Sequence, residues 1–193
     1  MGQDFQILNA PRPPSWRDPQ RMTRLPGGLA VPRGILVAML SLCCAAACLI
    51  PPRSGFREAI SLQVARGEVV AWLIIASTAA ATVSSIPHML RVGRYFSAVF
   101  LVLVVVGLCS LVRTDPTSAH HLNTFTYMAG GLLLWIWCVW LGSRSVMLGI
   151  CALASTSGAF ACLASLGIGE RAMILSTLVA LNYMLWADQS EAE

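Results

Sequence analysis

The sequence reads Val-Phe-Leu-Val-Leu-Val-Val-Val from residue 99 to residue 106, inside an apolar stretch that covers residues 95–112. The whole stretch contains no charged residue and no histidine. A helix needs about 20 apolar residues to cross the hydrocarbon core of a bilayer, where backbone N–H and C=O groups must be paired within the protein. Residues 95–112 are therefore predicted to form a membrane-spanning helix.

Five further stretches share these properties and account for most of the remaining chain. They cover residues 34–50, 69–86, 122–141, 146–166 and 172–187. Of the 193 residues, 56% are hydrophobic and 11% are charged, whereas about one quarter of a soluble domain is charged. We predict an all-α integral membrane protein, built as a bundle of six transmembrane helices.

Short tails flank this membrane domain, to which we assign residues 34–187. Residues 1–33 are basic and rich in proline, so they cannot bury a core. We expect this tail to be extended or disordered unless a partner holds it. Residues 188–193 form an acidic tail.

The first loop is the longest connection between the predicted spans. Within residues 53–67, Phe56, Ile60 and Val64 recur every four positions, and the residues between them are mostly polar. This spacing places the apolar side chains on one face of a helix. We predict a short interfacial helix that lies on the membrane surface.

The distribution of arginine predicts the orientation in the membrane. All 13 basic residues are arginines, and cytoplasmic loops carry an excess of positive charge. More of the arginines fall on the cytoplasmic side if the N-terminus is cytoplasmic than if it is not. We therefore predict cytoplasmic N- and C-termini, in a bacterial inner membrane or an organelle membrane.

Several functional classes are disfavoured by what the spans lack. Transporters and proton pumps usually place Asp, Glu, Arg or His inside the helix bundle, and none of these residues occurs in the six stretches. The seven cysteines all lie in apolar stretches without a CxxC pair, which is typical of buried packing residues. His88 is predicted to lie on the opposite membrane face from His120 and His121, so they cannot share one haem or metal. We predict no metal site, no cofactor and no nucleic-acid partner.

One cluster of ionisable residues remains, at the predicted non-cytoplasmic ends of the helices. It consists of Asp115, His120, His121, Glu170 and Arg171. Asp115 is expected near Arg171, and one of the two histidines near Glu170. The cluster is interpreted in three ways: as a cap of salt bridges, as a site for a lipid headgroup or small ligand, or as a hydrolytic site.

Small residues recur every four positions in residues 146–166 and predict close packing between helices. The residues assigned to this packing are Ser157, Gly158, Ala161 and Ser165, and the adjacent Gly130 and Gly131 are assigned the same role in residues 122–141. We expect the helix of residues 146–166 to be the central one. The same rows of small residues are also consistent with an interface to another subunit.

Three short motifs resemble those of a known family. Thr114-Asp115-Pro116 follows the third stretch, His120 or His121 opens the fourth, and Gly167-Ile168-Gly169-Glu170-Arg171 precedes the sixth. Over residues 34–186 the chain is similar to the uncharacterised six-helix membrane family DUF 998, a relative of the DRAM/Frag-type membrane proteins. The resemblance implies a six-helix bundle of unknown activity and groups the same ionisable residues.

Three functions follow from these patterns. The charge-free helices, the rows of small residues and the arginine-rich tail favour a non-enzymatic multi-pass membrane protein that acts through membrane lipids or other membrane-protein subunits. A second hypothesis is an accessory subunit of a larger membrane complex, such as a respiratory or photosynthetic assembly. A third is a membrane enzyme or transporter that uses the cluster around Asp115 and Glu170.

Overall fold

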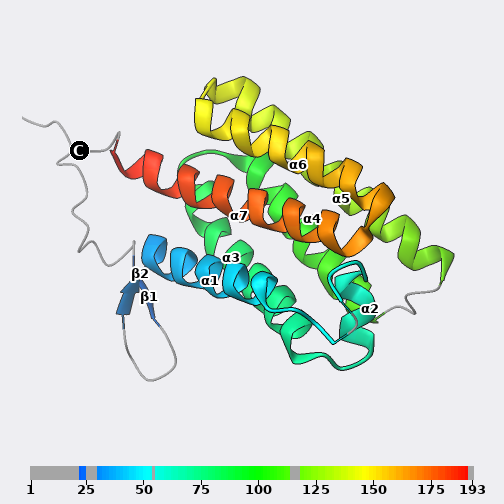
Figure 1. The fold of residues 1–193 in the computed structure, drawn as a ribbon. Helices are drawn as coiled ribbons and strands as arrows, with labels where there is room; N and C mark the ends of the chain where they lie inside the picture. The colour runs from blue at the N-terminus through cyan, green and yellow to red at the C-terminus, as the bar shows by residue number, and fades with distance from the viewer. Residues whose placement is uncertain (1–21, 25–29, 54, 114–117, 191–193) are drawn as a thin grey trace, which may run out of the picture.

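The computed structural model describes residues 22–24, 30–53, 55–113 and 118–190. These residues form helices apart from one hairpin and the connecting loops (Figure 1). The helices are α1 (Arg33–Leu49), α2 (Ile60–Ala65), α3 (Val69–Arg91), α4 (Tyr95–Arg113), α5 (Ala119–Ser143), α6 (Val146–Ala164) and α7 (Leu166–Ser190). Strands β1 (Met22–Arg24) and β2 (Ala30–Pro32) pair antiparallel, with Thr23 opposite Val31.

Each of the six long helices contains most of one predicted apolar stretch, and α2 lies in the first loop, where a short helix was expected. Helix α7 begins at Leu166, six residues before the predicted stretch of residues 172–187. Among the described residues, three helical segments are long and apolar enough to cross a membrane: Val69–Arg91, Asn123–Ser143 and Val146–Ala164. The all-α fold and a membrane location are thus supported by the length and composition of these helices.

The expected end of the second span at residue 86 is wrong. Helix α3 continues through Pro87 to Arg91. Proline lacks the N–H that would bond to the carbonyl four residues earlier, which weakens a helix but does not always end it. His88 and Arg91 lie in the last turn of α3, where positive charge favours the helix C-terminus.

Helix α7 occupies the middle of the bundle (Figure 1). It packs against α1, α3, α5 and α6, and the buried Leu178 and Leu181 belong to it. Helix α6 packs chiefly against α5 and α7, and its Leu163 is 86% exposed. The expectation that residues 146–166 form the central helix is therefore wrong.

The close approach of α6 and α7 depends on Gly158. A Cβ atom placed there would lie 3.0 Å from the Ala172 Cβ and 3.1 Å from the Gly169 carbonyl oxygen. Ser157, on the neighbouring row, is exposed, so its predicted packing role is not observed. Ala161 is half-buried, and Ser165 ends α6 in an extended conformation.

Only one of the two adjacent glycines in α5 makes a close contact. A Cβ atom at Gly131 would lie 2.9 Å from the ring of Phe100 in α4. A Cβ atom at Gly130 would meet nothing within 4 Å, and this residue is exposed. Packing of α5 on α4 thus uses Gly131, whereas Gly130 makes no close contact within the described part of the bundle.

The outer surface of the bundle is apolar on every long helix. Leu42, Leu103, Leu134 and Leu163, from α1, α4, α5 and α6, are each more than half exposed. Apolar patches of this extent are uncommon on soluble monomers and mark contact with a membrane or another protein. The helices therefore bury one face in the bundle and leave the other suited to lipid.

Candidate functional site

The start of α7 contacts the first loop, which in the structure comprises residues 50–68 and includes α2 (Figure 1). The Gly167 N–H donates a hydrogen bond to the Arg57 carbonyl oxygen at 3.2 Å. A Cβ atom at Gly167 would overlap the carbonyl oxygens of Phe56 and Glu58. The loop backbone can lie this close to α7 because residue 167 has no side chain.

Glu170 holds the beginning of α2. Its side chain is 7% exposed, and its Oε2 accepts a hydrogen bond from the Ile60 N–H at 2.5 Å. The first N–H groups of a helix have no partner within the helix. Because Ile60 is the first residue of α2, the Glu170 carboxyl supplies an acceptor that α2 itself lacks.

Arg171 holds the loop segment before α2. It is 5% exposed, and its Nη1 donates hydrogen bonds to the carbonyl oxygens of Gly167 at 2.8 Å and Phe56 at 3.4 Å. Its guanidinium carbon lies 5.5 Å from the centre of the Phe56 ring, within the range of a cation–π interaction. Its Nη2 donates to Oε1 of Gln63 at 2.9 Å.

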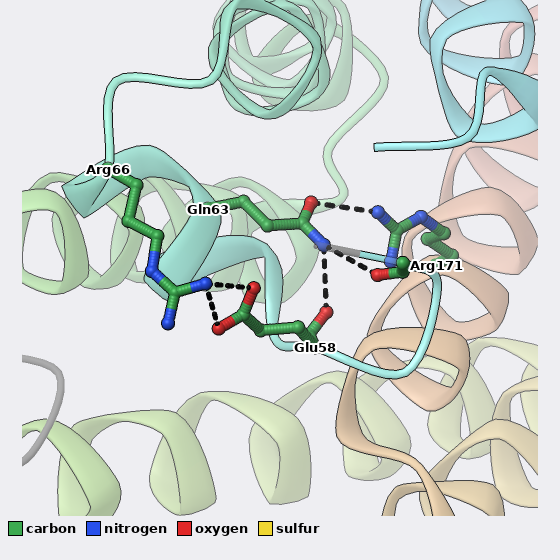
Figure 2. A network of polar contacts seen from close by, with 5 residues as sticks. Glu58, Gln63, Arg66 and Arg171 are labelled. Carbon is green, nitrogen blue, oxygen red and sulfur yellow. Dashed lines mark hydrogen bonds and ion pairs between the residues drawn. The ribbon is translucent and has the colours of Figure 1, made fainter. Parts of the chain in front are cut away.

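Gln63 links these contacts, as Figure 2 shows. Its side chain is fully buried, and its Nε2 donates to the carbonyl oxygens of Gly55 at 3.3 Å and Glu58 at 3.0 Å. Both N–H groups and the oxygen of the amide are therefore used. The amide joins Arg171 of α7 to the backbone of the first loop.

An ion pair lies at the outer edge of this network (Figure 2). Arg66 Nη1 is 2.7 Å from Oε1 and 2.8 Å from Oε2 of Glu58. More than half of the Arg66 side chain is exposed, and exposed pairs contribute at most about 1 kcal/mol. This exposed pair therefore adds little to the buried contacts of Gln63, Glu170 and Arg171.

The carboxyl of Glu170 lies before the apolar stretch that begins at Ala172. Burial raises the pKa of Glu170 to about 7. The Ile60 N–H and the charge of Arg171 act in the opposite direction, because both favour the ionised carboxylate. Loss of hydration is thus the dominant effect on this group.

Glu170 also lines a small apolar cavity between α7 and the helices around it. The cavity has a volume of about 40 Å³, and Phe125 and Met173 are among its lining residues. This volume corresponds to about one water molecule in the liquid.

Two of the five predicted cluster residues are placed by the structure with their side chains. Glu170 and Arg171 contact the first loop, a partner that the sequence did not indicate. His120 and His121 belong to the first turn of α5, but their side chains lie outside the described residues, and so does Asp115. The expected pairs between these groups stay predictions.

Sequence reasoning missed Gln63 as a member of this cluster. The four-residue spacing of apolar side chains assigned it to the polar face of the predicted interfacial helix. In the structure the Gln63 side chain is buried and contacts Arg171, whereas Arg57 and Arg66 of the same predicted face are exposed. The close glycines of the Gly167-Ile168-Gly169 segment were the available signal, since paired glycines often mark a close approach of two backbones.

The described polar contacts of Glu170, Arg171 and Gln63 lie within the protein. Arg171 Nε is buried without a hydrogen-bond partner among the described residues. Within the described ranges, no three His, Cys, Asp or Glu side chains gather as metal ligands. The arrangement acts as a clamp, here called the Glu170–Arg171 clamp, which fixes the first loop to α7.

Comparison of the chain with protein-family models, curated proteins and solved structures found no match. The resemblance to a six-helix family noted from the motifs therefore stays a prediction.

Proposed function

We propose that this protein is a non-enzymatic membrane protein with six spans, which acts through contacts with lipids or other membrane proteins. The observation that supports this most is the Glu170–Arg171 clamp, because its ionisable groups bind the protein's own loop. The exposed apolar side chains on all long helices give the same protein a wide surface for lipid.

The proposed six spans are the three segments that are long and apolar enough to cross a membrane and the three other long helices. Helices α1, α4 and α7 run alongside the three apolar segments in the same bundle (Figure 1). With six spans both termini lie on one side, and the arginine distribution favours the cytoplasm. A cysteine introduced at Ser118 should then react with a membrane-impermeant maleimide from the non-cytoplasmic side, whereas cytoplasmic labelling contradicts this topology.

Isolation from native membranes tests the function. In mild detergent, the protein should retain phospholipid or a partner protein, both of which mass spectrometry identifies. A lone monomer with neither lipid nor partner contradicts the proposal. Alanine substitution at Glu170 and Arg171 should lower stability, whereas loss of function without loss of stability would favour an enzyme or transporter.

The accessory-subunit hypothesis is supported by a separate surface. An open groove of about 540 Å³ lies between α1 and α7, and its α1 wall contains Ala38, Ser41 and Ala45. Small residues at such positions allow another helix to approach closely in lipid. Crosslinking in intact membranes from a cysteine at Ala45 would capture a neighbouring subunit, and its absence would weigh against this second function.

A further inference from the structure

We propose that a pocket where α1 ends and α3 begins binds the phosphate of a phospholipid headgroup, held by Arg53 and Arg66. The proposal rests on the lipid-contact function above and gives it a site. The pocket lies on the outer side of the first loop, apart from the buried contacts of Glu170 and Arg171.

The pocket has the size of a ligand site. Its volume is about 650 Å³, within the range of about 300–1,000 Å³ that is usual for small-molecule sites. Its lining residues are Pro51, Pro52, Arg53, Arg66, Gly67, Glu68, Val69 and Val70. The lining thus combines two arginines and one carboxylate with apolar side chains.

The two arginines have donors available for an anion. Arg53 is exposed and makes no hydrogen bond or ion pair with any residue that the structure describes. Arg66 uses Nη1 for Glu58, and its Nε and Nη2 make no hydrogen bond within the described ranges. A guanidinium presents its N–H groups as a planar fork that matches the oxygens of a phosphate.

The surroundings of the pocket favour a lipid over free phosphate. Val69, which lines the pocket, is 71% exposed, and Leu49 at the end of α1 is 78% exposed. Trp72, one turn further along α3, is 44% exposed, and tryptophan is enriched at membrane interfaces. The charged pocket therefore continues into an apolar surface, as the headgroup and acyl chains of a phospholipid require.

The Glu170–Arg171 clamp also fixes this pocket. The Glu68 N–H donates to the Gln63 carbonyl oxygen at 3.0 Å, and the Gln63 side chain is held by Arg171. Arg66 lies between Gln63 and Glu68 in sequence, so its backbone is constrained from both sides. A site that is ordered before binding loses less entropy when the ligand arrives.

Lipid retention by the full-length protein tests the site. Wild-type protein in nanodiscs containing phosphatidylglycerol would be released into detergent, and native mass spectrometry would count the lipids that stay bound. The variants are R53Q, R66Q and the double variant. R57Q is the matched control, because Arg57 is exposed in the same loop and does not line the pocket. E58Q controls for the lost ion pair of Arg66.

We expect the double variant to retain phosphatidylglycerol at least about tenfold more weakly than wild type, since each charge-assisted hydrogen bond contributes about one factor of ten. R57Q and E58Q should retain the lipid as wild type does. Diacylglycerol, which lacks phosphate, should be retained weakly by all variants. Inorganic phosphate should compete poorly, because it has no acyl chains to cover the exposed apolar side chains of Leu49 and Val69.

Equal retention of phosphatidylglycerol by wild type and the R53Q/R66Q variant overturns the site and leaves the proposed function intact. Inorganic phosphate that displaces the lipid at similar concentration overturns the assignment to a lipid. Wild-type protein that retains no lipid and no partner contradicts the proposed function itself.

Discussion

Arg171 Nη2 donates a hydrogen bond to Gln63 Oε1 at 2.9 Å, and both side chains are almost completely buried. This contact joins α7 to a loop more than a hundred residues earlier in the chain. A buried guanidinium without hydrogen-bond partners is strongly unfavourable. The first loop therefore folds around Arg171, and the arginine is part of the structure rather than a free ligand-binding group.

Gln63→Ala should lower the free energy of unfolding by about 2–4 kcal/mol, because it removes a partner of buried Arg171 and two donors to loop carbonyls. Unfolding in detergent micelles, followed by circular dichroism, measures the change. Leu62→Ala in the same short helix is the matched control, since Leu62 is only half-buried. Equal effects of the two substitutions would contradict the role of the amide.

Gly167→Ala should lower stability by about 1–3 kcal/mol, because its methyl group overlaps the loop carbonyl of Glu58. Gly130→Ala is the matched control within a helix, since a Cβ atom there meets no neighbour. The control should be neutral or more stable by up to about 1 kcal/mol, from the higher helix propensity of alanine. Thermal unfolding of both variants measures these changes in stability. If Gly167→Ala leaves the stability unchanged, the loop is not held against α7.

Gly158→Leu should prevent α6 from packing on α7, because even a single added carbon would contact Ala172 and the Gly169 carbonyl oxygen. We expect a loss of more than about 2 kcal/mol. Ser157→Leu, one residue away and exposed, should change stability by less than about 0.5 kcal/mol. Similar losses for both variants would contradict the observed orientation of α6.

Stability should depend on pH through Glu170. Its pKa is about 7 in the folded protein, against about 4.5 for an ordinary carboxyl. The folded state therefore holds this proton more tightly, and its stability falls as pH rises between these two values. Below about pH 4.5 the Glu170 carboxyl is protonated in both the folded and the unfolded protein, so the free-energy cost of burying its negative charge is absent.

The Glu170→Gln variant provides the comparison, because its amide cannot ionise. As pH rises from about 4.5 to about 7, the unfolding midpoint of wild type should fall relative to that of E170Q. Above about pH 7 the difference between the two midpoints should stay constant. A difference that stays constant from about pH 4.5 to about pH 7 would mean that the buried carboxyl does not titrate there.

The approximate positions of the long helices could be predicted from the sequence, because each contains a long apolar stretch without charged residues. Helix α3 extended beyond the prediction, since proline near a C-terminus costs one hydrogen bond without stopping the helix. The central place of α7 could not be predicted, because the hydrophobicity of a stretch does not show which other helices pack around it. Which helix is surrounded depends on side-chain contacts between distant segments.

The candidate site was predictable only in part. Glu170 and Arg171 stood out as charges beside an apolar stretch, and they do lie together at the start of α7. Their partners in the first loop could not be derived from spacing, because a buried glutamine such as Gln63 has the same local pattern as an exposed one. Its burial is decided by a charged group that is distant in sequence.

The central claim is that the Glu170–Arg171 clamp holds the first loop, and a double-mutant cycle between Gln63 and Arg171 tests it most directly. The free energies of unfolding of wild type, Q63L, R171M and the double variant would be measured in the same micelles. The direct contact predicts a coupling energy of about 1.5–3 kcal/mol. Effects that add within about 0.5 kcal/mol would contradict the clamp and return Arg171 to the list of candidate ligand-binding groups.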